Sequence, residues 1–260
     1  MIQAKFQELA AQGEGALVLY VTAGDPSLDQ LPEILAFLEE SGADLIEVGI
    51  PFSDPIADGP TIQASSQRAL DRGVTPRQVI DAIQKSQVSI PIITMGYVNN
   101  ALQLGFEPFA AMLQDAGVSG VILSDLAPEE SAEWKSAAVK HEIESVFLVA
   151  PTSTDERLRI ACSAASGFVY AVSRTGVTGN QSTVGGGLEP FVSRIRKHTE
   201  LPIAVGFGIS SPEHVRSVME SGANGAVVGS WLVNELASGW PGNRESLGEQ
   251  IRALKAATRK

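Results

Sequence analysis

The stretch Pro202-Ile203-Ala204-Val205-Gly206-Phe207-Gly208-Ile209-Ser210-Ser211-Pro212 carries the pattern that decides the fold. Its apolar run predicts a strand that is buried on both faces, and the run ends at two glycines. Ser211-Pro212 then predicts a helix start, because serine caps free N–H groups and proline fits the first helical position. The stretch therefore predicts a strand, a tight turn and a helix in succession, which is the repeating unit of α/β proteins.

The same unit recurs along the chain. Eight short apolar runs alternate with amphipathic stretches, and they cover residues 16–21, 45–48, 90–95, 120–123, 146–149, 168–172, 202–205 and 226–228. Helix starts are expected at Thr75-Pro76 and at Ser27, which is spaced to form a capping box with Gln30. Helix ends are expected at Gly73, Gly117 and Gly222, because glycine adopts the left-handed backbone that commonly follows a helix.

Eight such units predict a closed (β/α)8 TIM barrel, for which about 250 residues is typical. An open, doubly wound sheet shows the same alternation and is the alternative. The barrel is favoured because the first run is followed by Thr22-Ala23-Gly24-Asp25-Pro26 and not by G-x-G-x-x-G, while glycine clusters follow the last two runs. We expect residues 1–260 to form one TIM-barrel domain. An extra N-terminal helix, with Ile2, Phe6 and Leu9 on one face, is expected to close its bottom.

Composition narrows the classes of function. The chain has 19 Lys and Arg against 30 Asp and Glu, a formal net charge of −11. Without a basic cluster, binding to nucleic acid or to an anionic membrane is not expected. The single cysteine, Cys162, precludes an intramolecular disulfide and a cysteine-based zinc site. The N-terminus shows no apolar signal core and no stretch reads as a membrane span, so a cytoplasmic protein is expected.

The catalytic groups of a barrel lie at the carboxyl ends of its strands. No lysine or histidine is expected there, which disfavours a Schiff-base aldolase, a histidine-ligated metal centre and a Ser-His-Asp triad. Carboxylates do follow the predicted strands, and the candidates are Asp25, Glu47, Asp54, Asp58, Asp125 and Asp155.

Glu47 differs from the other carboxylates because it lies within an apolar run, Leu45-Ile46-Glu47-Val48-Gly49-Ile50. Alternation of side chains along a strand points it into the barrel, near the mouth. Desolvation there would raise its pKa toward neutrality, which suits a group that both donates and accepts a proton. A buried glutamate that only hydrogen-bonds a neighbour is the alternative, and the residues alone leave both open.

The loops around Glu47 supply further candidates. Residues 51–60, with three prolines and two aspartates, form either a stiff turn or a lid that carries Asp58 over the site. The glycines of Val205-Gly206-Phe207-Gly208 and Gly229-Ser230 leave N–H groups bare at helix starts, which favours a phosphate site over glycine packing alone. The glycine-rich loop 173–187 is either a flap that closes over a ligand or an ordinary surface loop. Three tyrosines near the mouth predict a pocket for a flat apolar group, namely Tyr20, Tyr97 and Tyr170.

Motifs occur in a fixed order over residues 16–233. The longest is Glu47-x-Gly49-Ile50-Pro51-Phe52-Ser53-Asp54-Pro55-x-Ala57-Asp58-Gly59-Pro60-x-Ile62-Gln63. The others are Tyr20-Val21-Thr22-Ala23-Gly24-Asp25-Pro26, Met95-Gly96-Tyr97-x-Asn99, Ala150-Pro151-Thr152, Ser173-Arg174-Thr175-Gly176-Val177-Thr178-Gly179 and Gly206-Phe207-Gly208-Ile209. Together they resemble the tryptophan synthase α subunit family, a (β/α)8 barrel that cleaves indole-3-glycerol phosphate to indole and glyceraldehyde 3-phosphate.

The resemblance implies a role for each matching position. Glu47 would be the general acid and base, and Asp58 would accept a hydrogen bond from the indole N–H. The substrate-binding positions would be Tyr20, Tyr97, Tyr170, Thr178, Gly179, Phe207, Gly208, Gly229 and Ser230, with Gly179, Gly208, Gly229 and Ser230 around the phosphate. Pro51 and Asp54 would face a β subunit in an α2β2 heterotetramer and indole would pass to it. No metal or cofactor is expected in this chain, and pyridoxal phosphate is expected only in the β subunit.

The chain departs from the family pattern at Ala127, Asn224 and Trp231, none of which is an expected catalytic group. Two alternatives are enzymes, namely a free-standing lyase that releases indole and another phosphate-handling barrel, such as an isomerase of the same pathway. A third is a non-catalytic partner that only activates a β subunit, against which the presence of both Glu47 and Asp58 argues.

Overall fold

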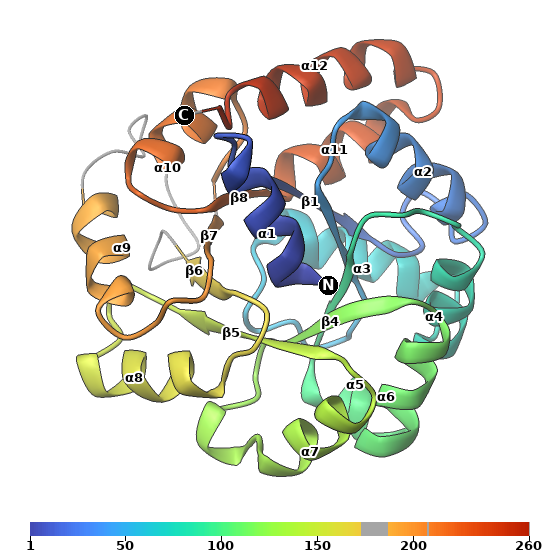
Figure 1. Ribbon diagram of the computed structural model, residues 1–260. Coiled ribbons are helices and arrows are strands. Elements are labelled where there is room, and N and C mark those ends of the chain that lie inside the picture. The colour runs from blue at the N-terminus through green and yellow to red at the C-terminus, as the bar shows by residue number, and fades with distance from the viewer. Residues whose placement is uncertain (173–186, 207, 260) are drawn as a thin grey trace.

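Eight parallel strands close into a barrel, each paired with the next in chain order and the last with the first (Figure 1). The computed structural model describes residues 1–172, 187–206 and 208–259. Within them the strands are β1 (Ala16–Thr22), β2 (Leu45–Gly49), β3 (Ile92–Gly96), β4 (Val118–Leu123), β5 (Glu144–Val149), β6 (Val169–Val172), β7 (Ile203–Gly206) and β8 (Gly225–Val228). Each begins and ends within two residues of a predicted run. The closed barrel is confirmed, and the open sheet was the wrong alternative.

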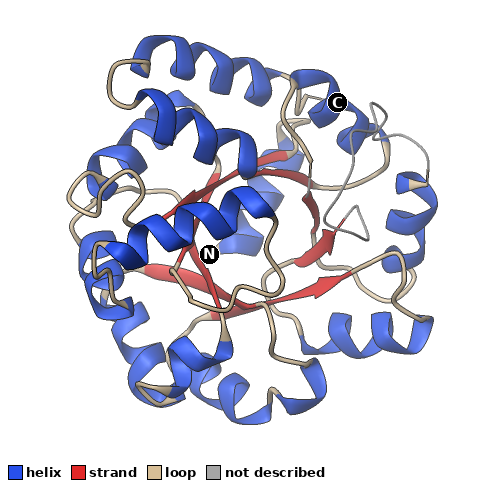
Figure 2. Ribbon diagram, turned by 180° about the vertical axis from the view of Figure 1, so that it is seen from behind, coloured by secondary structure: helices blue, strands red, loops and turns tan. Residues whose placement is uncertain are grey.

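Helices surround the strands, and Figure 2 shows the strands in red within a ring of blue helices. The helices are α1 (Ile2–Ala11), α2 (Leu31–Ser41), α3 (Pro60–Asp71), α4 (Pro76–Gln84), α5 (Val98–Leu102), α6 (Phe106–Asp115), η1 (Pro128–Glu130), α7 (Ala132–Lys140), α8 (Asp155–Ala164), α9 (Leu188–Arg196), α10 (Pro212–Glu220), α11 (Ser230–Gly239) and α12 (Arg244–Ala256). In the part of the chain that the structure describes, no helix is both long and apolar enough to cross a membrane.

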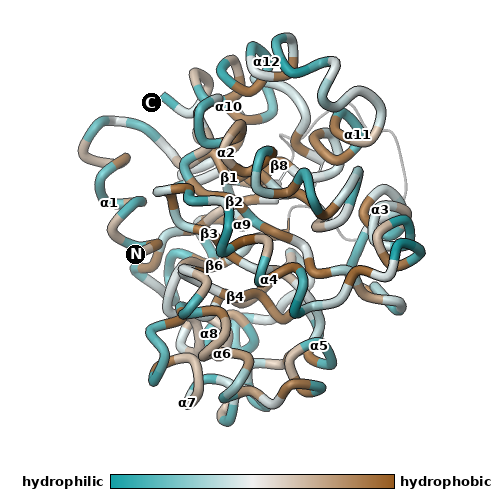
Figure 3. The backbone as a smooth tube through the Cα atoms, turned by 90° about the vertical axis from the view of Figure 1, so that its right-hand side faces the viewer, coloured by the Kyte–Doolittle hydropathy of each residue, from teal (hydrophilic) through white to brown (hydrophobic). Residues whose placement is uncertain are grey.

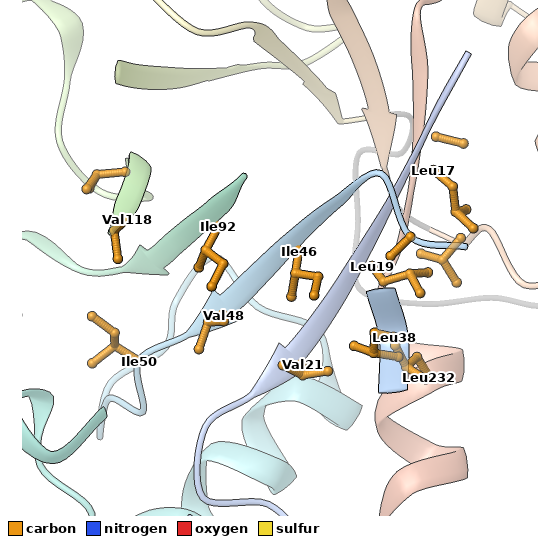
Figure 4. Close-up of a cluster of buried hydrophobic side chains, with 14 of the residues drawn as sticks. Leu17, Leu19, Val21, Leu38, Ile46, Val48, Ile50, Ile92, Val118 and Leu232 are labelled. Carbon is orange, nitrogen blue, oxygen red and sulfur yellow. The ribbon is translucent and has the colours of Figure 1, made fainter. Parts of the chain in front are cut away.

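Two hydrophobic cores follow from the alternation of side chains along each strand. Ile46 and Val48 of β2 face outward into a core shared with the helices, and Figure 4 shows them with Leu38 of α2 and Leu232 of α11. Leu45 belongs instead to the inner core of the barrel. Figure 3 shows brown, hydrophobic stretches of the tube in the interior, where the strands are labelled. Because both faces of the strands are buried, the strands read as continuous apolar runs in the sequence.

Helix α1 closes the bottom of the barrel, as predicted. Ile2, Phe6 and Leu9 lie on its buried face and join the inner core. The ring of Phe6 packs against Phe168, with the ring centroids 5.8 Å apart. With the bottom filled by α1, the open end of the barrel is the end at which the strands finish.

The predicted helix boundaries are confirmed except at α2. Thr75 and Ser211 cap α4 and α10, and Thr75 forms a capping box with Gln78. The prediction of a capping box at Ser27 was wrong, because α2 begins at Leu31 and its N-cap residue, Gln30, makes no side-chain cap. The Leu31 N–H instead donates to the Leu28 carbonyl at 3.1 Å, and Pro32 has no N–H to cap. At the predicted helix ends, φ is +76° at Gly73, +75° at Gly117 and +87° at Gly222.

Candidate active site

Glu47 points into the barrel from the middle of β2. It is a direct register partner of Tyr20 on β1 and of Ile93 on β3. Its side chain is fully buried, and neither carboxyl oxygen has a hydrogen-bond partner among the described residues. The alternative interpretation is a buried glutamate that only hydrogen-bonds a neighbouring residue. The described contacts include no such hydrogen bond. An unpartnered buried carboxyl is costly to ionise and is therefore poised to exchange a proton with a ligand.

The surroundings of Glu47 decide its protonation state. Burial, and to a smaller degree the negative charge of Asp58, raises the pKa of Glu47 to about 8. The group is therefore mostly protonated at neutral pH and can still release its proton within the physiological range. A carboxyl with such a pKa can act as an acid in one step and as a base in the next.

Asp58 is brought to Glu47 by the loop between β2 and α3. The Tyr97 hydroxyl donates to Oδ2 of Asp58 at 2.9 Å, and the backbone N–H of Ala57 donates to the same hydroxyl oxygen at 3.0 Å. The Phe52 ring stacks on the Tyr97 ring with 4.8 Å between the centroids. These contacts anchor the loop to Tyr97, the residue that follows β3, and hold the Asp58 carboxylate there.

Burial raises the pKa of Asp58 to about 6, while the hydrogen bond from Tyr97 opposes that rise. At neutral pH the pair therefore consists of a mostly protonated Glu47 and a mostly ionised Asp58. Two nearby carboxyl groups that differ in this way can hold different roles in one reaction.

Tyr20 and Tyr170 cross the interior from β1 and β6. A Cβ atom built on Gly49 would lie 2.0 Å from the Tyr20 hydroxyl oxygen, and one built on Gly206 would lie 2.2 Å from that of Tyr170. The glycine that ends β2 and the glycine that ends β7 therefore leave room for the two phenols. Burial raises the pKa of both tyrosines well above the usual value, so both hydroxyls stay protonated. The three predicted tyrosines are all buried toward the mouth of the barrel.

The expected phosphate positions lie where β7 and β8 finish. Gly208 has a left-handed backbone with φ of +76° and is exposed. Gly229 is the N-cap residue of α11, so the free N–H groups of this helix start at Ser230. A Cβ on Gly229 would lie 3.5 Å from Cβ of Tyr20, which places this helix start beside the mouth. Thr178, Gly179 and Phe207, with the rest of the predicted flap up to residue 186, lie outside the described residues.

The remaining carboxylates that follow strands have other partners. Asp25 is buried and accepts two hydrogen bonds from Arg68, at 2.9 and 2.6 Å. Asp125 accepts from the backbone N–H of Val98 at 2.6 Å. Two exposed carboxylates contact neighbouring side chains, namely Asp54 with Ser53 and Asp155 with Arg194. Asp25, Asp125 and Asp155 therefore support loops and helix ends, whereas the contact of Asp54 is only with its neighbour in sequence.

No described lysine or histidine lies at the carboxyl end of a strand, as predicted. They occur on α1, α4, α7, α9, α10 and α12 or directly after these helices. Among the described residues, no group of three or more His, Cys, Asp or Glu side chains is arranged to hold a metal ion.

Two hydroxyl side chains near Tyr20 are absent from the sequence prediction. Thr22 of β1 and Ser65 of α3 are buried, and their Oγ atoms lie 2.7 Å apart. Thr22 lies two residues after Tyr20 on β1, so alternation predicts that its side chain also faces the interior, and the sequence could have indicated it. The part that Ser65 plays depends on how α3 packs, and the local sequence does not contain that information.

The departures from the family pattern fit their surroundings. The Asn224 side-chain oxygen accepts from Arg196 at 2.7 Å and from the backbone N–H of Ile203 at 3.0 Å, so the amide supplies both acceptor contacts. Trp231 is partly buried and packs against the outer core from the first turn of α11. Ala127 precedes the short helix η1 as its N-cap residue.

Comparisons with known proteins agree on one family. Residues 6–259 match the family model of the tryptophan synthase alpha chain. The tryptophan synthase alpha chain of Geotalea uraniireducens is 47% identical to this chain, covering 99% of it and 97% of the relative. The tryptophan synthase alpha chain of Methanosarcina acetivorans is 43% identical, and the match covers 98% of this chain and 93% of the relative.

Solved structures give the same result. A chain of tryptophan synthase from Mycobacterium tuberculosis has a TM-score of 0.91 and 36% identity, covering 100% of this chain and 98% of that one. Subunit alpha from Legionella pneumophila has a TM-score of 0.89 and 32% identity, covering 99% and 97%.

Proposed function

The chain belongs to the tryptophan synthase alpha chain family, and from that premise we propose that Glu47 is the acid and base with which it cleaves indole-3-glycerol phosphate. The enzyme is a lyase of tryptophan biosynthesis, and its products are indole and glyceraldehyde 3-phosphate. The observation that carries the proposal is the buried Glu47 carboxyl, which has no hydrogen-bond partner among the described residues. We assign the activity to residues 1–260 acting as one domain.

The two carboxyl groups are sufficient for the proton transfers. Protonated Glu47 gives its proton to C3 of the indole ring, which forms the indolenine tautomer. Glu47, now ionised, takes the proton of the side-chain hydroxyl next to that carbon. The hydroxyl oxygen becomes a carbonyl, the bond to C3 breaks, and its electron pair returns to the ring. Glu47 ends protonated, so the group is ready for another cycle.

Asp58 holds the other end of the ring in this scheme. Its carboxylate accepts a hydrogen bond from the indole N–H, and the interaction strengthens as that nitrogen gains positive charge in the indolenine. The pKa of about 6 keeps Asp58 ionised at neutral pH, while the pKa of about 8 keeps Glu47 protonated. The Tyr97 hydroxyl positions Asp58 by donating to it.

The phosphate is assigned to the N-terminal end of α11 and to the turn after β7. Free N–H groups at Ser230, with the bare backbone of Gly208 and Gly229, can hold a phosphoryl group without a lysine. Thr178, Gly179 and Phe207 complete the assignment from the family pattern. Tyr20, Tyr97 and Tyr170 line the space for the indole ring.

Replacement of Glu47 by glutamine tests the proposal. Glu47→Gln keeps the volume and removes the transferable proton, so indole release should fall by about 10²–10⁴-fold while folding is retained. Glu130→Gln is the matched control, because Glu130 is exposed on η1 and should leave the rate unchanged. Near-normal turnover in Glu47→Gln would refute the role of Glu47, and no indole from the wild-type chain would support the non-catalytic partner.

We also propose that this chain docks a β subunit in an α2β2 heterotetramer through the loop between β2 and α3. Pro51 is buried and would shape the loop from beneath, whereas Asp54 is exposed. Ile56 in the same loop is 83% exposed, an apolar side chain that a partner could cover.

Pyridoxal phosphate is assigned to that partner and no cofactor to this chain. A cytoplasmic location is also proposed, which the single cysteine supports.

The docking proposal is tested by titrating a β subunit into the chain and measuring the dissociation constant. Ile56→Asp should weaken binding by tenfold or more, because about 1.4 kcal/mol of apolar contact would be lost. Val139→Asp is the control, since Val139 is 76% exposed on α7, outside the proposed face. A chain that binds no β subunit and still releases indole would be a free-standing lyase.

A further inference from the structure

Three buried hydroxyl groups form a connected chain beside Glu47. Oγ of Ser65 on α3 lies 2.8 Å from the backbone oxygen of Ile62 and 2.7 Å from Oγ1 of Thr22. Its single hydrogen goes to Thr22, because Thr22 uses its own hydrogen toward Tyr20. The Thr22 hydroxyl in turn donates to the Tyr20 hydroxyl oxygen at 3.4 Å. The contacts join α3 to β1 and hold the Tyr20 oxygen from the side of Thr22.

The Tyr20 hydrogen is not used in that chain. A phenol has one hydrogen to donate, and the oxygen of Tyr20 acts as the acceptor toward Thr22. The ring crosses from β1 so that its hydroxyl lies over Gly49, where a side chain would be only 2.0 Å away. Gly49 is the next inward-facing position of β2 after Glu47, so the phenol stands between Glu47 and the mouth.

We propose that Tyr20 is a positioning residue for the cleavage reaction, whose hydroxyl, supported by Thr22 and Ser65, donates a hydrogen bond to the Glu47 carboxylate whenever Glu47 has released its proton. Glu47 and Tyr20 are register partners on adjacent strands, and both side chains face the interior. Neither Glu47 oxygen has a hydrogen-bond partner among the described residues, Tyr20 included, so both are free to accept when Glu47 ionises. The inference rests on the proposed role of Glu47.

The charged and titratable groups around Glu47 support this assignment. They are Tyr20 on β1, Asp58 on the loop after β2, Tyr97 after β3 and Tyr170 on β6. The Tyr97 hydroxyl already donates to Asp58, and Asp58 carries negative charge, so neither stabilises an ionised Glu47. Tyr170 stands over Gly206 on the opposite wall and no second hydroxyl supports it among the described contacts. Tyr20 is the phenol that is both adjacent to Glu47 in register and held in place.

The consequence appears in the pH profile of cleavage. The rate falls at high pH as Glu47 loses the proton that it must donate, so the basic limb reports the pKa of Glu47. Removing a donor to the carboxylate raises that pKa. Tyr20→Phe should therefore move the basic limb up by about one pH unit, and kcat should fall more than KM changes, because the donor acts when Glu47 is charged.

Thr22→Val and Ser65→Ala are the second set of variants, since they keep the phenol and remove its support. Each should move the basic limb in the same direction by less than Tyr20→Phe does. The double variant Tyr20→Phe with Thr22→Val should move it no further than Tyr20→Phe alone, because Thr22 acts through the phenol. Folding of each variant is checked by thermal unfolding.

Several results would overturn the inference. They are an unchanged basic limb in Tyr20→Phe, a limb moved to lower pH, or shifts that add in the double variant. A separate result would reject the proposed role of Glu47. In that case Glu47→Gln would keep its turnover, and the basic limb of its pH profile would remain. A Tyr20→Phe profile like that of the wild type, together with an inactive Glu47→Gln, rejects the role of Tyr20 and leaves that of Glu47 standing.

Discussion

The Tyr97 hydroxyl lies 2.9 Å from Oδ2 of Asp58 and donates a hydrogen bond to it. The same oxygen accepts from the backbone N–H of Ala57, so one phenol holds both the carboxylate and the loop that presents it. The second carboxyl group of the site therefore depends on a residue contributed by the end of a different strand.

Tyr97→Phe should lower kcat/KM for cleavage by about tenfold, the usual value of one hydrogen bond to a charged group. The bond from Tyr97 holds the pKa of Asp58 down, so its loss should raise that pKa above about 6. The defect should therefore be larger at about pH 6.5 than at about pH 8. A pH series of kcat/KM measures this, and an equal defect at both values would contradict it.

Glu47 should make the protein less stable as pH rises. Its pKa is about 8 in the folded chain against a usual value of 4.5, so between these values the folded state holds a proton that the unfolded chain has released. The free energy of unfolding therefore falls with increasing pH over this range. Asp58 contributes in the same direction, but mainly below its folded pKa of about 6.

A comparison at about pH 6.5 and 8.5 therefore isolates Glu47, and the wild type should lose about 2 kcal/mol more than Glu47→Gln between them. Urea unfolding of both proteins at the two pH values gives the difference. If both proteins lost stability equally, Glu47 would titrate near its ordinary value in the folded chain.

Phe6→Ala should destabilise the protein by about 3–5 kcal/mol, because it opens a cavity where α1 plugs the barrel. Phe6 packs on Phe168, and a Cβ on Gly225 would lie 3.1 Å from its ring. Val139→Ala, at an exposed position on α7, serves as the control and should cost less than about 0.5 kcal/mol. Denaturant midpoints compare the two, and a small effect of Phe6→Ala would mean that α1 docks only weakly.

Thr75→Ala should cost about 1 kcal/mol, because its side chain caps α4 in a capping box with Gln78. Ser27→Ala makes the matched comparison, since α2 begins at Leu31 without a side-chain cap and the change should leave stability nearly unaltered. Equal costs in thermal unfolding would show that Ser27 does cap the chain in solution.

Local sequence determined the strands, most helix boundaries and the direction of Glu47, because each follows from a short-range rule. Alternation fixes which side of a strand a residue faces, and the buried apolar runs mark all eight strands. Thr75 caps α4 through a residue three positions away, so neighbouring sequence was enough. The motif at Glu47 likewise pointed to the family that the comparisons show.

Only the tertiary structure decided which groups meet in the barrel. The pairing of Asp58 with Tyr97 spans 39 residues, and the contact of Thr22 with Ser65 spans 43. The phenols of Tyr20 and Tyr170 occupy the space over Gly49 and Gly206. Each phenol comes from a different strand, so the sequence around the glycines does not reveal it. Ser27 does not cap α2, because a turn in which the Leu31 N–H donates to the Leu28 carbonyl precedes the helix, and the helix begins only at Leu31. Periodicity acts over a few residues, whereas burial, hydrogen bonding and pKa depend on side chains that closure of the barrel brings together.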